Sequence, residues 1–343
     1  MERIIFIGPC GGGFIPDNGA SVKNYHIINY FKKKNIHLRL IDTQNWRRNP
    51  FILLKLSSVL FVSRKSKVIV SANNISSYRL LSVLYYFNFQ NVIYWVIGGT
   101  IADWIKGKKV KVAPYKNCRH IFVEGEKMKK TFNCCNIFQV KTIPNFKLIK
   151  DIPHFTKNQG GIVHFVFISR IIPEKGCGYI FEAVKILQKM GLRNRFDVTF
   201  YGPIEESYKD VFIRNLNVVE NIKYKGFLDL RDNTNYKELS HYDAMLFPTF
   251  WDGEGFPGVL IDAFICGLPV LASDWGLNSD LIDVGKTGIL YPVHDAEAIA
   301  DCMRTLIFNQ AQITSMSKNC REKALEFDIA NVLSDVFLKK YIL

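Results

Sequence analysis

The chain has 343 residues, 48% of them hydrophobic and 22% charged, and a formal net charge of +14. These proportions are those of a globular protein, so they argue against general disorder and against a membrane protein of many spans. A chain of this length is predicted to form two domains, each with its own core. Its first residues, Met1–Gly8, lack the basic leader and cleavage site of a signal peptide, so a strand and a cytoplasmic location are expected.

The eight cysteines are scattered along the chain, with no CxxC pair and no histidine at metal-ligand spacing. Reduced thiols are therefore expected, and neither a metal nor a cofactor is predicted. The longest apolar run, residues 80–97, is interrupted by four polar residues and is predicted to be a helix and a strand, not a membrane span. The cysteines are Cys10, Cys118, Cys134, Cys135, Cys177, Cys266, Cys302 and Cys320.

Short β-rich apolar runs alternate with segments of helical periodicity along the whole chain, which predicts an α/β fold with parallel sheets. The first half holds six such runs, enough for one doubly wound sheet. The predicted strands of this sheet are Ile4–Gly8, Ile36–Asp42, Val68–Ala72, Val92–Gly98, His120–Glu124 and Val140–Pro144.

The stretch 147–161 has little apolar periodicity and contains Pro153, Gly160 and Gly161, so we expect a linker there. A second series of strands follows, which predicts a second Rossmann-like domain. Two such sheets facing one another would place a nucleotide in a cleft between the domains. The second series consists of Val163–Ser169, Asp197–Gly202, Ile222–Gly226, Ala244–Thr249, Pro269–Ser273 and Gly288–Tyr291.

The last segment, residues 327–343, carries apolar residues at helical spacing. It is predicted to be a helix that packs either back on the first domain or on its own domain. The expected organisation is therefore an acceptor-binding domain in residues 1–150, a nucleotide-sugar-binding domain in residues 151–326 and a terminal helix in residues 327–343.

Residues 247–270 contain a strand end, a glycine-rich loop and the start of a helix near Pro257. Such a helix start leaves backbone amides without intrahelical partners, here those of Gly255, Phe256, Gly258 and Val259 on either side of Pro257. Free amides of this kind suit a diphosphate. Glu254 precedes this turn, where a carboxylate can accept hydrogen bonds from sugar hydroxyls. Asp262 lies further along the helix, so the two acids could hold the two ends of one ligand. Alternatively, Glu254 only favours the helix N-terminus and Asp262 is a solvated helix residue.

The string from Phe247 through Ser273 resembles the E-x7-E signature of the family 4 glycosyltransferases, retaining enzymes of the GT-B fold. In that family the first acid contacts the donor sugar and the second binds the ribose. The resemblance assigns these roles to Glu254 and Asp262, although the second acid here is Asp rather than Glu.

A second motif is the pair of cations Arg170 and Lys175, which follow a predicted strand and precede Gly176. A guanidinium grips phosphate oxygens bidentately and an ammonium adds a point charge, so together they could stabilise a leaving diphosphate. Two solvated loop charges are the alternative. The order of residues is similar to the phosphate clamp of the same family, which makes both residues candidates for catalysis and for donor binding.

Weaker similarities complete the candidate site. The loop 8–13 resembles the glycine loop of the family's first domain, which makes Gly12, Gly13 and Gly19 candidates for contact with the donor. A tight turn without a ligand is the alternative. By the same resemblance the nucleotide base lies near Gly226 and Phe227.

The chain departs from the family after the fourth strand, where many members carry a histidine that faces the sugar. Here the chain reads Gly98-Gly99-Thr100-Ile-Ala-Asp103. Thr100 or Asp103 is a possible substitute for that histidine, and Asp103 is equally well explained as a residue of a helix start.

The predicted function is retaining, metal-independent transfer of a sugar from a nucleoside diphosphate sugar, UDP-linked by expectation, to an acceptor hydroxyl. No protein nucleophile is evident, so the departing phosphate would assist the deprotonation of the acceptor on the same face. Rival enzymes are a GT-B sugar-nucleotide epimerase and a glycogen phosphorylase type. A basic nucleic-acid-binding protein is the rival from another class.

The positive charge is uneven. Residues 1–150 contain 25 basic and 6 acidic residues, a net charge of +19, whereas residues 151–343 have a net charge of −5. An anionic membrane surface or a lipid diphosphate acceptor would explain this excess, and a solvated surface or nucleic-acid binding are the alternatives. We expect a peripheral enzyme on the cytoplasmic face of the membrane that extends a lipid-linked glycan for a capsule or an O-antigen, with no nucleic acid as partner.

Overall fold

The computed structural model of the protein describes residues 4–11, 19–44, 46, 49, 51–62, 64–149, 161–230 and 233–343. The chain forms two compact units. The first unit contains residues 1–148 together with 332–343, and the second unit contains residues 149–331. The candidate residues Gly12 and Gly13, the basic pair Arg47 and Arg48, and most of the expected linker lie outside the described residues.

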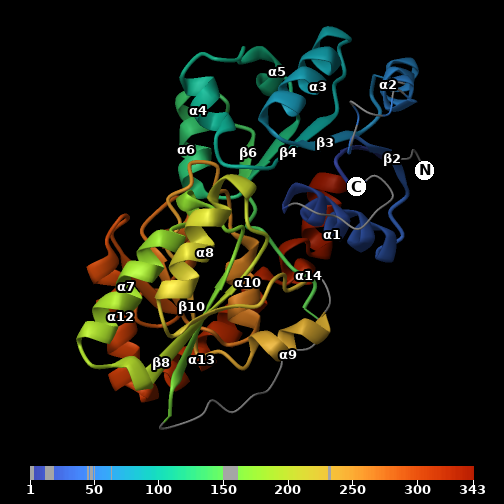
Figure 1. The fold of residues 1–343 in the computed structure, drawn as a ribbon. Helices are drawn as coiled ribbons and strands as arrows, with labels where there is room; N and C mark the ends of the chain where they lie inside the picture. The colour runs from blue at the N-terminus through green and yellow to red at the C-terminus, as the bar shows by residue number, and fades with distance from the viewer. Residues whose placement is uncertain are drawn as a thin grey trace. The chain divides into compact units, whose positions relative to one another are not determined.

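The first unit is built on a parallel sheet of six strands in the order β2-β1-β3-β4-β5-β6 (Figure 1). Its strands are β1 (Ile4–Gly8), β2 (Leu38–Asp42), β3 (Val68–Ala72), β4 (Val92–Val96), β5 (His120–Val123) and β6 (Val140–Thr142). Its helices are α1 (Gly19–Lys33), α2 (Phe51–Ser57) with the following 3-10 turn η1 (Ser58–Phe61), α3 (Asn74–Tyr86), α4 (Ile101–Lys106), α5 (Ala113–Lys116) and α6 (Glu126–Cys134).

Both faces of this first sheet are buried, which explains its nearly continuous apolar strands. In β4, for example, Val92, Tyr94 and Val96 belong to the core beneath α3 to α6. Trp95 points to the other face, where its ring makes edge contacts with Phe122 and Phe146.

The second unit repeats this architecture with the strand order β12-β11-β10-β7-β8-β9. Its strands are β7 (Val163–Ile168), β8 (Phe196–Tyr201), β9 (Ile222–Tyr224), β10 (Ala244–Phe247), β11 (Val270–Ser273) and β12 (Gly288–Tyr291). Its helices are α7 (Cys177–Lys189), α8 (Lys209–Val218), α9 (Tyr236–Leu239), α10 (Gly258–Ile265), α11 (Asn278–Leu281), α12 (Ala296–Phe308) and α13 (Gln310–Ala324). Counted from its own first strand, this is the 3-2-1-4-5-6 order of a dinucleotide-binding fold, so its topological switch point lies between β7 and β10.

The predicted α/β fold with two parallel Rossmann-like sheets is confirmed, and each of the twelve predicted strands is present. The differences are at strand ends. The expected strands 92–98 and 244–249 stop two residues earlier, at Val96 and Phe247, because the following residues leave the sheet and enter loops at its carboxyl edge. Those loops carry the candidate site residues.

The spacing of apolar residues in 327–343 predicts one helix, and this prediction is wrong. These residues form α14 (Ile329–Val332), α15 (Asp335–Phe337) and a π-helical turn (Leu338–Ile342). The helix breaks at Ser334, which has an extended backbone and whose hydroxyl caps α15 by accepting from the amide of Phe337. Val336, one of the apolar residues of this segment, is 76% exposed.

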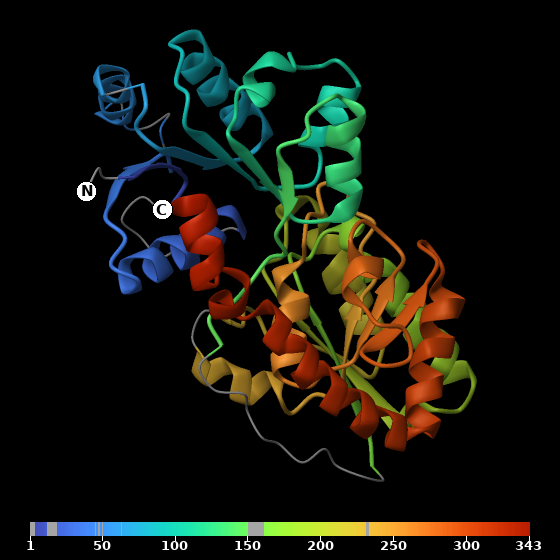
Figure 2. The ribbon, with the colours of Figure 1, turned by 180° about the vertical axis from the view of Figure 1, so that it is seen from behind.

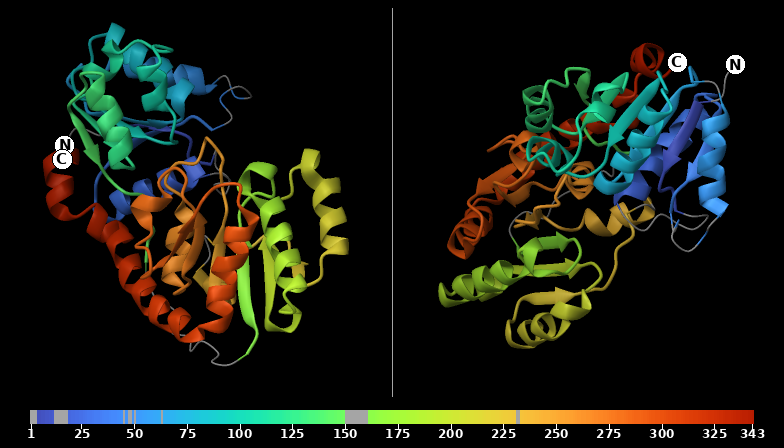
Figure 3. Two further views of the ribbon diagram at one scale, coloured as in Figure 1. Left: turned by 90° about the vertical axis from the view of Figure 1, so that its left-hand side faces the viewer. Right: turned by 90° about the horizontal axis from the view of Figure 1, so that it is seen from above.

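Residues from Val332 onward belong to the first unit. Figures 2 and 3 show this red terminal segment beside α1, and an ion pair of 2.7 Å joins Lys34 Nζ to Asp335 Oδ1. Lys67 Nζ donates to the carbonyl oxygen of Ile342 at 2.6 Å. The ring of Tyr341 makes edge contacts with His120 and Phe122 of β5. The segment thus covers one face of the first sheet.

Candidate active site

Two loops of the second unit meet at the topological switch point, one after β7 and one after β10. Gly176 in the first loop has φ +77°, and a Cβ on it would lie 2.2 Å from the carbonyl oxygen of Pro248 in the second. The amide of Phe250 donates to the carbonyl oxygen of Glu174 at 2.9 Å. Only glycine permits both this backbone conformation and this approach, so Gly176 holds the two candidate motifs together.

Lys175 and Glu254, 79 residues apart in the chain, form an ion pair between these loops. Their side chains are only 6% and 9% exposed. Thr249 Oγ1 donates to the same Glu254 oxygen at 3.0 Å. Burial lowers the pKa of the Lys175 ammonium below its ordinary value of 10.5, although the carboxylate of Glu254 acts in the opposite direction. The interpretation of Lys175 as a solvated loop charge is therefore wrong.

Arg170 is the exposed cation of this site. Its guanidinium carbon lies 4.8 Å from the ring centroid of Trp251, and Lys175 Nζ lies at the same distance from that ring. The indole attracts both cations, which keeps the two positive charges beside one aromatic surface. Trp251 was missed from the sequence, and an aromatic residue within a glycine-rich loop is the signal that could have identified it.

The helix α10 begins at Gly258, with Pro257 as its extended N-cap residue. Its first amides lack intrahelical partners by the geometry of a helix start, so they suit an anion. Phe256 is buried, with its ring 5.6 Å from that of Phe327, so only its backbone is available to a ligand. Gly255, Gly258 and Val259 are half-buried.

Asp262 lies on the inner side of α10 and is 3% exposed, so the interpretation of Asp262 as a solvated helix residue is wrong. Tyr236 Oη, from α9, donates to Asp262 Oδ1 at 2.7 Å. Burial and the nearby carboxylate raise the pKa of Tyr236 well above its ordinary value. Tyr236 was missed from the sequence, because nothing local marks a tyrosine 26 residues away as a partner of this acid.

The expected base-binding residues follow β9, at the same carboxyl edge of the second sheet. Gly226 has φ +76°, and its carbonyl oxygen accepts from the amide of Gly202 at 2.7 Å. Phe227 is 65% exposed, which leaves its ring accessible. The structure gives no contact between these residues and the Lys175–Glu254 pair.

In the first unit the backbone of Gly8 packs closely against β3, while the expected contact of Gly19 with the donor stays a prediction. A Cβ on Gly8 would lie 2.1 Å from the carbonyl oxygen of Ser71, whereas Gly19 begins α1 with open space around it. Asn24 reinforces the turn because its side-chain amide donates to the carbonyl oxygens of Pro9 and Ser71.

The residues that follow the fourth strand have local partners. Thr100 Oγ1 accepts a hydrogen bond from Asn74, and Asp103 lies in the first turn of α4. The described residues contain no cluster of His, Cys, Asp and Glu side chains that could hold a metal ion. Among the same residues no helix is long and apolar enough to cross a membrane.

The family model for the glycosyl transferases group 1 matches residues 151–326, slightly more than half of the chain. The chain belongs to this family. The matched residues contain both loops that meet at the switch point. Among curated relatives, the amylovoran biosynthesis glycosyltransferase AmsK of Erwinia amylovora is 29% identical over 160 residues. That match covers 46% of this chain and only 39% of AmsK.

Solved structures share this fold along nearly the whole chain. HepE of Anabaena, crystallised with UDP, is similar with a TM-score of 0.73 and 14% identity, over 99% of this chain and 100% of HepE. Sucrose-phosphate synthase of Thermosynechococcus elongatus is similar with a TM-score of 0.77 and 15% identity, over 99% and 98% of the two chains. At these identities the likeness concerns the fold alone.

Proposed function

We propose that this protein transfers a sugar from a UDP-linked donor to an acceptor hydroxyl, with retention at the anomeric carbon and without a metal ion. The observation that carries the proposal is the cluster of Arg170, Trp251, Lys175 and Glu254 at the switch point of the second unit. This is where a sheet of this topology binds a nucleotide. The HepE structure, with UDP bound to a similar fold, supports the choice of donor.

In this proposal the bond between the anomeric carbon and the diphosphate oxygen breaks, and the diphosphate leaves with the electron pair. Arg170, Lys175 and the first amides of α10 stabilise the negative charge that develops. The acceptor oxygen attacks from the same face, and its proton passes to the departing phosphate oxygen. No protein nucleophile and no metal is required.

Glu254 has two tasks in this scheme. Its carboxylate compensates the buried Lys175 ammonium, and it accepts hydrogen bonds from the hydroxyls of the donor sugar. Asp262 keeps the ribose contact that the family resemblance implies, with its carboxylate oriented by Tyr236. Gly226 and Phe227 would contact the base. In this proposal Arg170 and Lys175 bind the leaving phosphates, so that their charges replace that of a metal.

Product analysis with a panel of nucleotide sugars tests the proposal. With a hydroxyl acceptor and a UDP-sugar, we expect a glycoside of the donor's anomeric configuration, and the same rate in the presence of a chelator, because the clamp supplies the charge that a metal otherwise would. Complete loss of activity with the chelator would contradict metal independence. An epimerised nucleotide sugar without transfer would instead favour the rival epimerase.

We further propose that the enzyme acts at an anionic membrane surface on a lipid-linked acceptor in the synthesis of a cell-surface polysaccharide. The net charge of +19 in residues 1–150 supports this, at about 1 kcal/mol for each basic residue near such a surface. The relative AmsK is named for the biosynthesis of one such polysaccharide.

Vesicle sedimentation tests the electrostatic part. Binding should require anionic lipid and should fall as salt is added. Replacing the exposed Lys106, Lys108 and Lys109 by Gln should weaken it, whereas the same change at the exposed second-unit residues Lys185, Lys189 and Lys318 should not. If binding at low salt does not depend on lipid charge, the electrostatic argument for membrane association is wrong and a soluble acceptor is favoured. Salt-dependent binding to duplex DNA would favour the nucleic-acid rival.

A further inference from the structure

The first unit exposes large apolar side chains on neighbouring elements, which we call the α2–α3 face. It consists of the outward residues of α2, of the turn η1 that follows it and of the C-terminal half of α3. Phe61 is 90% exposed and Tyr86 is 83% exposed. Such residues are normal on a surface when scattered singly, but here they lie on α2, η1 and α3, which meet around one pocket. The main members are Phe51, Leu53, Leu54, Phe61, Val83 and Tyr86.

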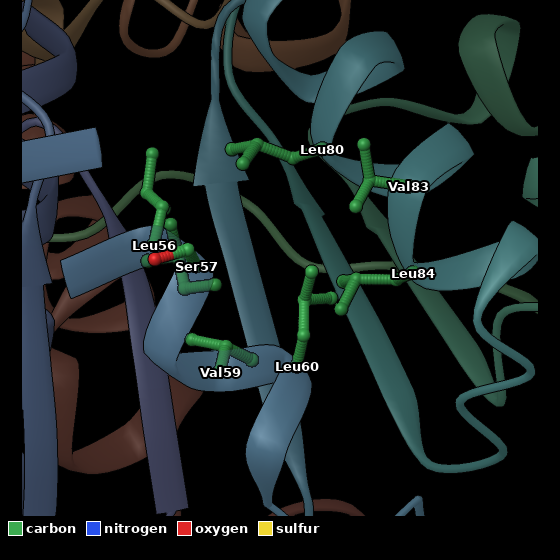
Figure 4. A pocket seen from close by; sticks show the side chains of 8 residues that line it. Leu56, Ser57, Val59, Leu60, Leu80, Val83 and Leu84 are labelled. Atoms are coloured by element: carbon green, nitrogen blue, oxygen red, sulfur yellow. The ribbon is translucent and has the colours of Figure 1, made fainter. Parts of the chain in front are cut away.

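An apolar pocket of about 160 Å³ lies between the two parts of this face. Figure 4 shows Leu56 and Leu60 from the α2 side and Leu80 and Leu84 from the α3 side around it. Of the eight lining residues only Ser57 is polar. A space of this size lined by aliphatic side chains accepts a short stretch of hydrocarbon and offers almost nothing to a polar ligand.

The stretch of sequence that carries most of this face has charge of one sign. Residues 43–102 contain seven basic residues and no aspartate or glutamate. Lys55 lies on α2 and Arg79 on α3, and both are exposed. The guanidinium of Arg64 lies 5.6 Å and 4.8 Å from the ring centroids of Phe87 and Phe89, beside the end of α3. The basic residues are Arg47, Arg48, Lys55, Arg64, Lys65, Lys67 and Arg79.

We propose that the α2–α3 face inserts into the acyl-chain region of an anionic lipid bilayer, with Lys55, Arg64 and Arg79 at the phosphate level. Exposed apolar side chains flanked by cations are the composition of a segment that lies in the membrane interface. A second copy of this chain fits the face poorly, because a symmetric pair would bring the same exposed cations, Lys55 and Arg79, together. The inference deepens the proposed membrane association and depends on it, but it does not depend on the sugar chemistry of the second unit.

The test compares two double variants on vesicles of equal parts phosphatidylglycerol and phosphatidylcholine. Leu54→Ser with Phe61→Ser should lower the partition coefficient on the order of tenfold for each side chain removed. The matched control is Val218→Ser with Phe308→Ser, which removes two similarly exposed apolar side chains from the second unit and should bind as the wild type does. Equal binding of both double variants and the wild type would overturn the proposal.

A second measurement separates insertion from electrostatic adsorption. The tryptophan fluorescence that Phe61→Trp adds should shift to the blue on vesicles and should be quenched by brominated acyl chains. Part of the vesicle binding should also persist at high salt. Emission that does not change with lipid would overturn insertion. Insertion would also be overturned if the wild type sediments as a dimer without lipid and the double variant at Leu54 and Phe61 sediments as a monomer.

Thermal stabilisation by UDP should be the same in the double variants as in the wild type, since the second unit is unchanged. The proposal is supported if the double variant at Leu54 and Phe61 loses vesicle binding but keeps UDP binding and transfer to a soluble acceptor. Failure of sugar transfer in a wild-type protein that still inserts would count against the proposed function alone.

Discussion

Glu254→Gln should reduce the rate of sugar transfer by at least about 100-fold while the protein remains folded. Glutamine keeps an acceptor oxygen for Lys175 and Thr249 but loses the charge that contacts the donor and compensates the buried ammonium. The rate is measured under saturating donor, with the melting temperature as a check of the fold. Glu174→Gln is the matched control, because Glu174 is an exposed acid in the facing loop and its backbone, not its side chain, makes the contact with Phe250.

The same variant has a pH signature. Burial already lowers the pKa of Lys175, and removal of the Glu254 charge should lower it further. A lysine whose folded pKa lies below its unfolded value costs stability at low pH, and the cost shrinks as pH rises toward 10.5. The loss in melting temperature relative to the wild type should therefore be larger at about pH 7 than at about pH 9.5. Wild-type transfer rates in a variant with unchanged melting would show that Glu254 is not needed for the chemistry.

Arg170→Ala should weaken UDP binding by about 10-fold to 100-fold, the effect of losing charge-assisted hydrogen bonds, and should leave uridine binding nearly unchanged. Isothermal titration with the two ligands measures this difference directly. Arg195→Ala is the matched control, since Arg195 is also exposed and its guanidinium lies 5.9 Å from an aromatic centroid, that of Phe308. Equal losses for UDP and uridine would contradict a phosphate clamp.

Lys175 requires a different substitution, because Lys175→Ala would leave the Glu254 carboxylate buried without its cation. Loss of one partner of a buried ion pair costs about 3–5 kcal/mol. The double variant Lys175→Met with Glu254→Gln removes both charges and should recover part of the stability that Lys175→Met alone loses. It should still bind UDP more weakly than the wild type. Recovery of UDP affinity together with stability would show that Lys175 is a structural partner only.

Much of the fold could be predicted from the sequence because a buried parallel strand is a short apolar run with few alternatives. In β1 and β3 the prediction matches the structure residue for residue, since glycine or polar residues end each run. The prediction of one final helix was wrong because the apolar spacing of residues 327–343 does not reveal the break at Ser334. Ser334 interrupts the helix by offering the backbone amide of Phe337 a side-chain acceptor, which favours a new helix start.

The candidate site was predictable as two motifs but not as one cluster. The order of residues indicates that Arg170 and Lys175 follow one strand and Glu254 another. It does not indicate that Lys175 turns inward to pair with Glu254 while Arg170 stays exposed, because that difference depends on the approach of Gly176 to Pro248. The contact between Tyr236 and Asp262 likewise depends on tertiary packing.

The membership of residues 332–343 in the first unit has a consequence for synthesis on the ribosome. The first sheet is translated early, but the segment that covers Phe122 leaves the ribosome only after the whole second unit. Until then the rings of β5 that contact Phe337 and Tyr341 stay uncovered, an exposed apolar surface of the kind that recruits chaperones. The second unit can therefore bury its core during translation, whereas the first unit completes the packing of this face only after the last residues have been synthesised.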